Sequence, residues 1–317
     1  MAQSKSLSFK RTAALKTIGF VIKHKQPEAA ELAKELSRIV LSEGLKICFA
    51  DESESTVKEF LSALKEQGHK DWSKKVSVVD KHDLADHSDF IILLGGDGTF
   101  ISIARLMKNR NVPVMGVNMG QLGFLTEIKR GEALETLRRI LDGKAMEVQS
   151  RALLEVTLTR GGKTIFQGPV VNDAVISKGA IARIIGLQVA VNGKWAHDVR
   201  ADGIIVSTPT GSTAYSLAAG GPILEPSLPA VVLTAISPHS LTQRPLVIPD
   251  TSVIQICLSH RPGHVLLTLD GQDVVDMKEA DIVTVRRFKK HSLKLISSPT
   301  RDYFSLLREK LKFGMRD

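Results

Sequence analysis

The segment that decides the fold is Phe90-Ile-Ile-Leu-Leu-Gly-Gly-Asp-Gly-Thr-Phe100. Its apolar part, residues 90–94, is typical of a strand that is buried on both faces of a parallel sheet. The glycines that follow allow the backbone to approach a ligand without interference from Cβ atoms. Residues 99–107 have helical spacing, so the positive end of a helix dipole would face the same point, beside Asp97. The predicted phosphate loop consists of Gly95, Gly96, Gly98 and Thr99.

Asp97 also has a plainer interpretation, in which it caps the helix while the glycines make a tight turn. The common phosphate motifs do not fit this chain. Gly96-Asp-Gly-Thr-Phe-Ile101 lacks the third glycine of G-x-G-x-x-G, and Gly162-Lys-Thr164 has Thr157 where a P-loop requires glycine. The H-R-D loop of protein kinases is also missing from the sequence. Phosphoryl transfer by this chain therefore requires another architecture.

The composition predicts a cytoplasmic protein with two domains. A chain of 317 residues with 43% hydrophobic content can bury sizeable cores. No apolar run approaches the roughly 18 residues that span a bilayer, and residues 1–15 lack an apolar signal core, so we expect a flexible tail there. Cys48 and Cys257 stand far apart, which favours buried free thiols over a disulfide or a zinc site.

The net charge of +9 favours anionic partners without choosing among nucleotides, nucleic acids and acidic membranes. The densest basic run, Val285-Arg-Arg-Phe-Lys-Lys-His291, alternates in a way that suits the solvated face of a strand. We therefore expect neither nucleic acid nor a membrane as a partner.

Strands and helices alternate in the first part of the chain, which predicts a mostly parallel sheet between helices. Ligands of such sheets bind beyond the carboxyl ends of the strands, where residues 95–99 fall. Strands are expected at 17–22, 45–50, 75–79, 90–94 and 112–117, and helices at 27–43, 55–66, 99–107 and 131–141.

The later part of the chain changes to short β-rich segments. Strands are expected at 153–159, 163–166, 173–177, 185–191, 194–199 and 203–207. Gly161-Gly162, Asn192-Gly193 and Asp270-Gly271 are typical of tight hairpins, so we expect mainly antiparallel pairing. A tail helix at 302–312 carries an apolar stripe and is expected to cover the first domain.

Three further segments carry site chemistry, and each also has a plain structural interpretation. Residues 118–126 follow a strand and suit a second backbone loop or an interdomain linker. Asn172-Asp173 presents an amide and a carboxylate, which suits vicinal ribose hydroxyls or an ordinary turn. Residues 208–216 combine hydroxyls and small side chains with Tyr215, which suits a nucleotide site or tight helix packing.

These segments, taken in order, resemble the NAD kinase family. The resemblance rests on Gly95-Gly-Asp-Gly-Thr99, on residues 118–126, on Asn172-Asp173 and on Thr208-Pro-Thr-Gly-Ser-Thr-Ala-Tyr215, and it runs from about residue 17 to 303. The first motif also occurs in diacylglycerol and sphingosine kinases and in phosphofructokinases. The last motif is specific to NAD kinases among these families.

The resemblance implies transfer of the γ-phosphoryl group of ATP to the 2′-hydroxyl of the adenosine ribose of NAD, giving NADP. Asp97 would be the proton acceptor, because a ribose hydroxyl is a poor nucleophile without a base. Arg183 and Arg200 are candidate partners of phosphate oxygens. The implied NAD-binding residues are Asp97, Gly98, Asn172, Asp173, Arg183, Arg200, Asp202, Thr213, Ala214, Tyr215, Ser216, Leu217, Ala218 and Gln272.

The expected architecture is a Rossmann-like α/β domain at residues 16–126, completed by residues 293–317, and an all-β NAD-binding domain at 127–292. The site is expected in the cleft between them. We expect Mg²⁺ to arrive with ATP, held by phosphates and water, because no carboxylate cage is evident. Self-association as dimers or tetramers is also implied. The alternatives are a diacylglycerol-type lipid kinase, a non-catalytic NADP-binding sensor and a nucleic-acid-binding protein.

Overall fold

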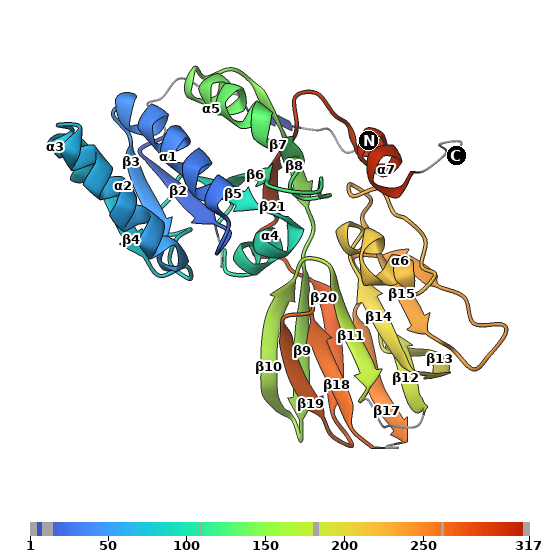
Figure 1. Ribbon diagram of the computed structural model, residues 1–317. Helices are drawn as coiled ribbons and strands as arrows, with labels where there is room; N and C mark the ends of the chain where they lie inside the picture. The colour runs from blue at the N-terminus through green and yellow to red at the C-terminus, as the bar shows by residue number, and fades with distance from the viewer. Residues whose placement is uncertain (1–4, 8–14, 108–109, 180–183, 261–262, 313–317) are drawn as a thin grey trace. The chain divides into compact units, whose positions relative to one another are not determined.

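A computed structural model describes residues 5–7, 15–107, 110–179, 184–260 and 263–312 (Figure 1). Contacts divide the chain into one unit of residues 1–150 with 293–317 and a second unit of residues 151–292. The predicted α/β and β-rich architecture is confirmed. The first unit extends past the predicted boundary at 126, because the next helix and two short strands pack with the first sheet. None of the described helices has the length and apolar character needed to span a bilayer.

The first unit is built on a mostly parallel sheet with the strand order β1-β8-β21-β6-β5-β2-β3-β4, in which β7 pairs with β6. Parallel pairing joins β21 to β6 and continues through β5, β2 and β3 to β4. The strands are β1 (Lys5–Leu7), β2 (Thr17–Ile22), β3 (Lys46–Ala50), β4 (Val76–Val79), β5 (Phe90–Gly95), β6 (Pro113–Asn118), β7 (Ile128–Lys129), β8 (Met146–Arg151) and β21 (Leu293–Ile296).

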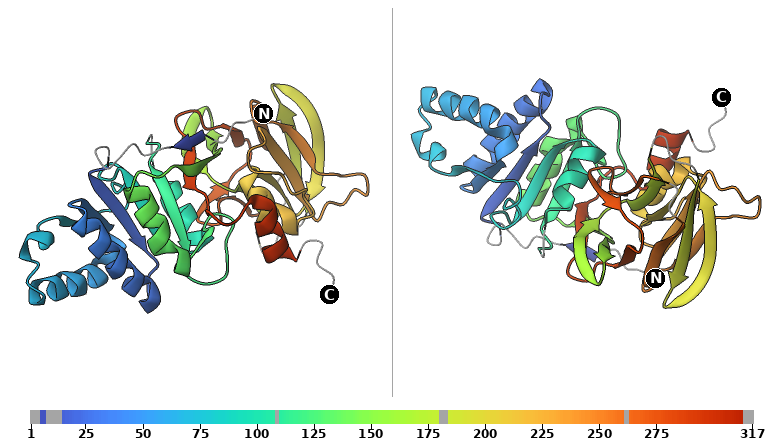
Figure 2. Two further views of the ribbon diagram at one scale, coloured as in Figure 1. Left: turned by 90° about the horizontal axis from the view of Figure 1, so that it is seen from above. Right: turned by 90° about the horizontal axis from the view of Figure 1, so that it is seen from below.

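Helices cover both faces of this sheet (Figures 1 and 2). Apolar residues of α1, α2 and α5 share one buried cluster with Ile18 and Phe20 of β2. On the opposite face, Phe100 of α4 packs against Gly116 of β6. The helices are α1 (Pro27–Ser42), α2 (Glu54–Glu66), α3 (Lys70–Ser73), α4 (Asp97–Ala104), α5 (Ala133–Leu141) and α7 (Tyr303–Leu311), with short 3-10 turns η1 (Asp51–Ser53) and η2 (Arg130–Glu132).

The strand order places the glycine loop at a topological switch point. From the central β2 the chain first adds β3 and β4 on one side and then β5 and β6 on the other. The carboxyl ends of β5 and β6 lie in register, with Gly95 opposite Asn118. Crevices for ligands form at such switch points in open parallel sheets. The loops after β5 and β6 therefore lie side by side at that edge, as the sequence predicts.

The second unit consists of two antiparallel sheets that share one apolar core. Their strand orders are β10-β9-β20-β17-β12-β13 and β16-β15-β14-β11-β18-β19. The strands are β9 (Leu154–Arg160), β10 (Lys163–Val170), β11 (Asp173–Lys178), β12 (Ile185–Val191), β13 (Lys194–Ala201), β14 (Gly203–Ser207), β15 (Ala230–Ile236), β16 (Leu246–Pro249), β17 (Ile254–His260), β18 (Val265–Leu269), β19 (Asp273–Met277) and β20 (Ile282–Arg287), with η3 (Thr210–Thr213) and α6 (Tyr215–Ala218) after β14.

All three predicted hairpin turns are confirmed. Gly161-Gly162, Asn192-Gly193 and Asp270-Gly271 have positive φ at both positions and join β9 to β10, β12 to β13 and β18 to β19. The basic run at the end of β20 alternates as predicted for a strand with one solvated face. Val283 and Val285 are fully buried, whereas Arg287 is half exposed and bonds the Asp250 carboxylate at 2.8 Å.

Candidate active site

The glycine loop joins β5 to α4 and leaves open space at two of its three glycines. Gly96 is the N-cap of α4 in an extended conformation, with φ −124°. A Cβ atom at Gly95 would lie 2.8 Å from the hydroxyl of Thr99, so this glycine serves packing within the loop. At Gly96 and Gly98 a Cβ atom would meet nothing within 4 Å. Backbone at these two positions is accessible to a ligand, in line with the predicted phosphate loop.

The Asp97 carboxylate does not cap α4; it binds the loop that follows β6. We call residues 118–126 the anchor loop. The backbone N–H of Phe124 donates to Oδ2 at 2.8 Å, and those of Leu125 and Thr126 donate to Oδ1 at 3.0 and 3.1 Å. The Thr126 hydroxyl donates to Oδ1 as well, at 3.1 Å. Asp97 is thus the first residue of the helix, with its carboxylate fixed by three consecutive peptide groups.

The anchor loop has a shape that only glycine permits at one position. A Cβ atom at Gly123 would lie 2.0 Å from Oδ1 of Asp97. Asn118 holds the two ends of the loop together, because its amide donates to the Thr126 hydroxyl at 3.1 Å while its carbonyl accepts from the N–H of Gly120 at 2.8 Å. These contacts make the segment an integral part of the Asp97 environment, and the alternative of a plain linker is wrong.

The C-terminal helix α7 returns to the first unit and reaches this carboxylate. Asp302 caps the helix by accepting from the N–H of Ser305 at 2.7 Å. The Lys310 ammonium lies 3.4 Å from Oδ2 of Asp97 and 4.6 Å above the centre of the Phe124 ring. The neighbouring Glu309 pairs with Lys129 at 2.9 Å.

A hollow of about 420 Å³ adjoins the anchor loop in the first unit. Basic side chains from the start of the α5 region and an acidic side chain from α7 line it together with loop backbone. The lining residues are Asn118, Met119, Gly120, Leu122, Lys129, Arg130, Gly131 and Glu309.

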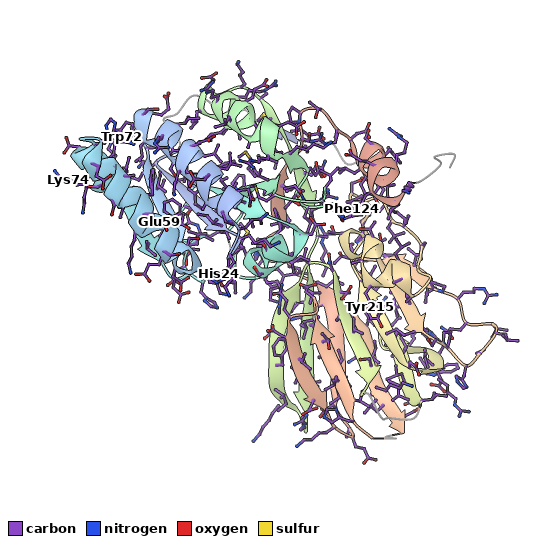
Figure 3. All side chains as sticks on the ribbon, viewed as in Figure 1. His24, Glu59, Trp72, Lys74, Phe124 and Tyr215 are labelled. Atoms are coloured by element: carbon purple, nitrogen blue, oxygen red, sulfur yellow. The ribbon has the colours of Figure 1, made fainter. Side chains whose placement is uncertain are left out.

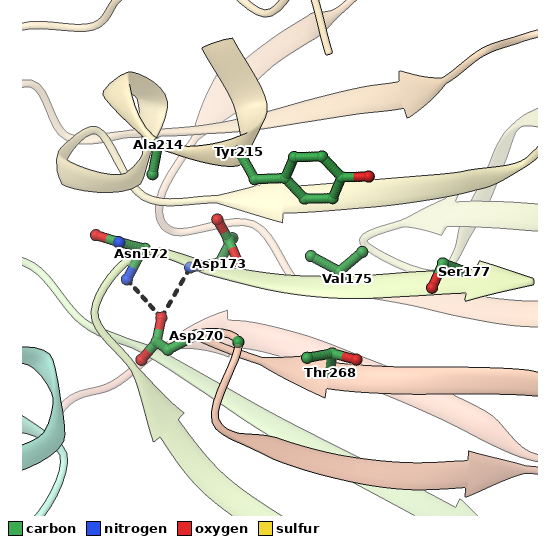
Figure 4. Close-up of a pocket in the computed structure, with 9 residues that line it drawn as sticks. Asn172, Asp173, Val175, Ser177, Ala214, Tyr215, Thr268 and Asp270 are labelled. Carbon is green, nitrogen blue, oxygen red and sulfur yellow. Dashed lines mark hydrogen bonds between the residues drawn. The ribbon is translucent and has the colours of Figure 1, made fainter. Parts of the chain in front are cut away.

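The second unit contains a separate hollow of about 290 Å³ on the face of β11 that points away from the apolar core (Figure 4). Asp173, Val175 and Ser177, which are every second residue of β11, all lie on that face. Ala214 and Tyr215 lie across from them. The remaining lining residues are Asn172, Thr268, Asp270 and Gly271. We call this hollow the β11 pocket. It brings together four of the predicted NAD-binding residues, namely Asn172, Asp173, Ala214 and Tyr215.

Asp270 fixes the edge of the β11 pocket, as Asp97 fixes the anchor loop. Its carboxylate accepts from the backbone N–H groups of Val171, Asn172 and Asp173 at 2.9, 2.8 and 3.0 Å. Figure 4 shows the bonds from Asn172 and Asp173. Asp270 itself occupies the left-handed region, with φ 51°, in the turn between β18 and β19. The turn thus carries a side chain that shapes the entry to β11, which is the next strand in the sheet.

Asp173 lies buried beside this second carboxylate. Burial, together with the nearby negative charge of Asp270, raises the pKa of Asp173 from 3.8 to about 7. A carboxyl group in this state can donate or accept a hydrogen bond near neutral pH. Such a group suits recognition of a sugar hydroxyl, which also does both.

The segment after β14 packs closely on Asn172. The Thr208 hydroxyl donates to the carbonyl of Val171 at 2.6 Å, and a Cβ atom at Gly211 would lie 2.2 Å from the carbonyl oxygen of Asn172. The Ser216 hydroxyl is fully buried and bonds the hydroxyl of Thr234 at 2.9 Å. Tyr215, by contrast, is 47% exposed and lines the pocket. Tight packing and a pocket-lining surface therefore occur together in this segment.

The other predicted NAD-binding residues that the structure describes are not part of the lining of the β11 pocket. Arg183 lies outside the described residues. Arg200 is exposed on β13, and Asp202 pairs with Lys178 at 2.7 Å. Thr213 bonds the carbonyl of Thr210 at 3.1 Å through its hydroxyl. The turn after β18 contains Gln272, and the short helix α6 contains Leu217 and Ala218.

Two residues of the two sites were missed by sequence reasoning. Asp270 was expected only to form a turn, although an acidic residue at such a turn can also bind backbone N–H groups. Lys310 carries no local signal, because its importance depends on its contact with Asp97, which is far away in the sequence. Gly123 was expected as one of two glycines that permit a backbone loop, but its contact with Asp97 could not be predicted. The pairing of strands and the return of α7 bring these residues into place.

A mostly parallel sheet with a glycine loop at its switch point, together with a β-rich unit whose pocket is lined by Asn172 and Asp173, is typical of nucleotide-binding phosphotransferases. Comparisons with known proteins identify the family. Residues 18–145 match the model of the ATP-NAD kinase N-terminal domain, and residues 171–298 match that of the C-terminal domain. The NAD kinase of Syntrophotalea carbinolica is 40% identical over 302 residues, covering 95% of this chain and all of that protein. The NAD kinase of Geotalea daltonii is 48% identical over 236 residues, or 74% of this chain and 82% of that protein.

The chain belongs to the ATP-NAD kinase family. Its activity is that of an NAD kinase, which transfers the γ-phosphoryl group of ATP to the 2′-hydroxyl of the adenosine ribose of NAD. This result favours the predicted function over the lipid-kinase and nucleic-acid alternatives.

Solved structures share the fold. Yeast NADH kinase complexed with NADH superposes with a TM-score of 0.85 at 24% identity, covering 96% of this chain and 90% of that one. An Archaeoglobus fulgidus NAD kinase in complex with ATP gives 0.63 at 22% identity, covering 93% and 98% of the two chains.

Proposed function

We propose that Asp97 is the general base of the phosphoryl transfer. It accepts the proton of the ribose 2′-hydroxyl while that oxygen forms a bond to the γ-phosphorus. The bond between the γ-phosphorus and the bridging oxygen breaks, and ADP leaves with its electron pair. The observation that carries this role is the fixation of the carboxylate by three backbone N–H groups next to an open glycine loop. A positioned base of this kind contributes on the order of 10²- to 10⁴-fold to the rate.

The glycine loop and the start of α4 are proposed to bind phosphate oxygens of ATP. Open space at Gly96 and Gly98 supports this assignment, because phosphate oxygens can reach the backbone N–H groups there. Phosphoryl transfer depends chiefly on positioning and on electrostatic stabilisation, so backbone donors suit it.

The β11 pocket is proposed to bind the adenosine ribose of NAD. Asn172 offers an amide, and Asp173 offers a buried carboxyl group with a pKa of about 7. Tyr215 supplies an exposed ring on which a base can stack. Arg183 and Arg200 remain proposed partners of phosphate oxygens, and Asp202, Thr213, Ser216, Leu217, Ala218 and Gln272 remain proposed NAD contacts.

Mg²⁺ is proposed to enter with ATP, bound by phosphate oxygens and water. Among the described residues, no group of three or more His, Cys, Asp or Glu side chains is arranged to hold a metal ion. The metal would supply charge neutralisation on the phosphates.

Self-association through the second unit is also proposed. Its edge strands β13, β16 and β19 carry exposed apolar side chains at Trp195, Val247 and Val274. Edge strands with such side chains favour contact with another chain. A cytoplasmic location is proposed as well, supported by the two cysteines, Cys48 and Cys257, which are free thiols.

The base assignment is tested with Asp97→Asn and a matched control, Asp89→Asn. Asp89 likewise accepts backbone N–H groups, those of Lys16 and Thr17, at 2.8 and 3.0 Å. We expect the rate of NADP formation to fall by about 10²-fold or more in Asp97→Asn. The Asp89→Asn enzyme should keep its rate. Equal rates for Asp97→Asn and wild type, in folded protein, would show that another group accepts the proton.

A further inference from the structure

The two oxygens of the Asp97 carboxylate differ in how many donors they accept. Oδ1 accepts three hydrogen bonds, from the N–H groups of Leu125 and Thr126 and from the Thr126 hydroxyl. Oδ2 accepts one backbone bond, from Phe124 at 2.8 Å, and contacts the Lys310 ammonium at 3.4 Å. A carboxylate oxygen offers about two lone pairs. A substrate hydroxyl that bonds this carboxylate therefore has to approach Oδ2, at the place that Lys310 occupies.

The position of Lys310 is set by the helix that carries it. Leu306 and Leu307 of α7 are buried. The centres of the Tyr303 and Phe124 rings lie 6.3 Å apart. Glu309 fixes the same turn through Lys129. The backbone near Lys310 is thus anchored, while its side chain remains 34% exposed. A lysine side chain has a flexible four-carbon stem, so its ammonium can shift by a few ångströms while the helix stays in place.

The ion pair itself contributes little to folding, because both side chains are partly exposed, Asp97 to 27% and Lys310 to 34%. Its place matters more for the reaction. A hydroxyl bonded to its base lies roughly 3 Å from it, and the attacked phosphorus lies roughly 3–3.5 Å beyond. The transferring group therefore passes within reach of the Lys310 ammonium. Negative charge spreads over its three non-bridging oxygens in the transition state.

We propose that Lys310 is a catalytic residue that moves from Asp97 to the transferring phosphoryl group. In the free enzyme its ammonium occupies the open lone pair of Oδ2. When the acceptor hydroxyl takes that lone pair, the ammonium bonds a non-bridging oxygen of the γ-phosphoryl group. The hydroxyl proton goes to Oδ2, the acceptor oxygen bonds phosphorus, and ADP departs with the electron pair of the broken P–O bond. Lys310 keeps its protons throughout. This inference rests on the proposed role of Asp97 as the base.

The test compares Lys310→Met, Lys310→Arg and the control Arg308→Met. Methionine keeps an apolar chain over Phe124 but removes the charge, whereas arginine keeps the charge. Arg308 lies on the same helix, is exposed and bonds the Ser305 hydroxyl at 3.1 Å. With saturating NAD, ATP and Mg²⁺, we expect Lys310→Met to lower kcat roughly 10- to 100-fold. The KM for NAD should stay the same or fall, because a competitor for Oδ2 is removed. Lys310→Arg should recover most of kcat, and Arg308→Met should match wild type.

A binding measurement gives a second result that does not depend on turnover or on the fraction of enzyme that is folded. ADP with aluminium fluoride mimics the transferring phosphoryl group, so we expect Lys310→Met to weaken its binding in the presence of NAD at least tenfold. The affinity for NAD alone should stay the same or rise. Binding of the mimic at wild-type affinity, or a kcat for Lys310→Met within threefold of wild type, would overturn the inference.

Asp97→Asn, measured in parallel, separates the two proposals. An inactive Asp97→Asn together with a fully active Lys310→Met would overturn the role of Lys310 alone. An Asp97→Asn enzyme with the wild-type rate would overturn the base assignment and the inference with it.

Discussion

Asp97 and Asp270 bind the backbone in the same way, each through the N–H groups of three consecutive residues. Bonds from several peptide groups fix the orientation of a carboxylate. In one case the result is a positioned carboxylate beside a glycine loop. In the other the result is a rigid entry to the strand that carries Asp173. Both carboxylates depend on close approach of the backbone.

The close approach of the anchor loop to Asp97 can be tested by adding a single Cβ atom at Gly123. In Gly123→Ala the new Cβ would lie 2.0 Å from Oδ1 of Asp97, so the carboxylate or the anchor loop has to shift. We expect NADP formation to drop at least tenfold, since misplacement by about 1 Å can cost about 10²-fold. The rate is measured beside that of Gly131→Ala, where a Cβ meets nothing within 4 Å. Similar rates for both variants would argue against the Asp97 geometry.

Asp173 predicts a dependence of stability on pH. Its pKa is raised in the folded protein from 3.8 to about 7, so between these values the folded state holds a proton that the unfolded chain has lost. The contribution of this residue to stability is therefore full below about pH 4 and is lost as pH rises to about 7. Asp173→Asn should remove this loss and gain stability relative to wild type as pH rises. Thermal unfolding of both proteins from pH 5 to pH 8 checks this, and a constant difference between their curves would contradict it.

At the scale of elements, the sequence predicted most of what positions the site. Continuous apolar runs predicted the central strands, and Gly-Gly, Asn-Gly and Asp-Gly pairs predicted the three hairpins. Strands β1, β7, β8, β15, β16, β17 and β21 were not predicted. Among them, β8 and β21 mix charged or polar residues with apolar ones and become recognisable only through their neighbours in the sheet. Helix α4 begins at Asp97, earlier than predicted, because Gly96 takes the capping position.

The turn between β18 and β19 makes a second prediction at this scale. Asp270→Ala removes the acceptor of three backbone N–H groups at residues 171–173. Leaving buried donors without partners costs roughly 1–3 kcal/mol, so the free energy of unfolding should fall by about that amount. The KM for NAD should rise as well, because Asn172 and Asp173 lose their support. Urea unfolding and initial rates measure the two effects. An unchanged KM for NAD would show that Asp270 does not support the proposed NAD site.

At the scale of the whole molecule, the two units contain different parts of the proposed site. The first contains the glycine loop, Asp97 and Lys310, and the second contains the β11 pocket. The side chains labelled in Figure 3 illustrate this division, with Phe124 in the first unit and Tyr215 in the second. The order of motifs along the sequence reveals this division. The contacts that fix each carboxylate come from residues 27 to 213 positions away, and no local pattern encodes them.

The exposed apolar edges of the second unit predict an oligomer. Sedimentation velocity at micromolar concentration should give a mass that is a multiple of 34.6 kDa. Val247→Lys on the edge strand β16 should shift the distribution toward smaller species, because a charge there opposes pairing of edges. A wild-type protein that sediments as a monomer at this concentration would contradict the proposal.

Single-turnover transfer from ATP labelled at the γ-phosphate, with NAD and Mg²⁺ bound beforehand, isolates the step in which Asp97 is proposed to accept the proton. It reports the chemical step without substrate binding or product release. We expect labelled NADP from wild type and a transfer rate at least about 10²-fold lower for Asp97→Asn, with both nucleotides still bound. Equal single-turnover rates for the two enzymes would contradict the claim that Asp97 accepts the proton.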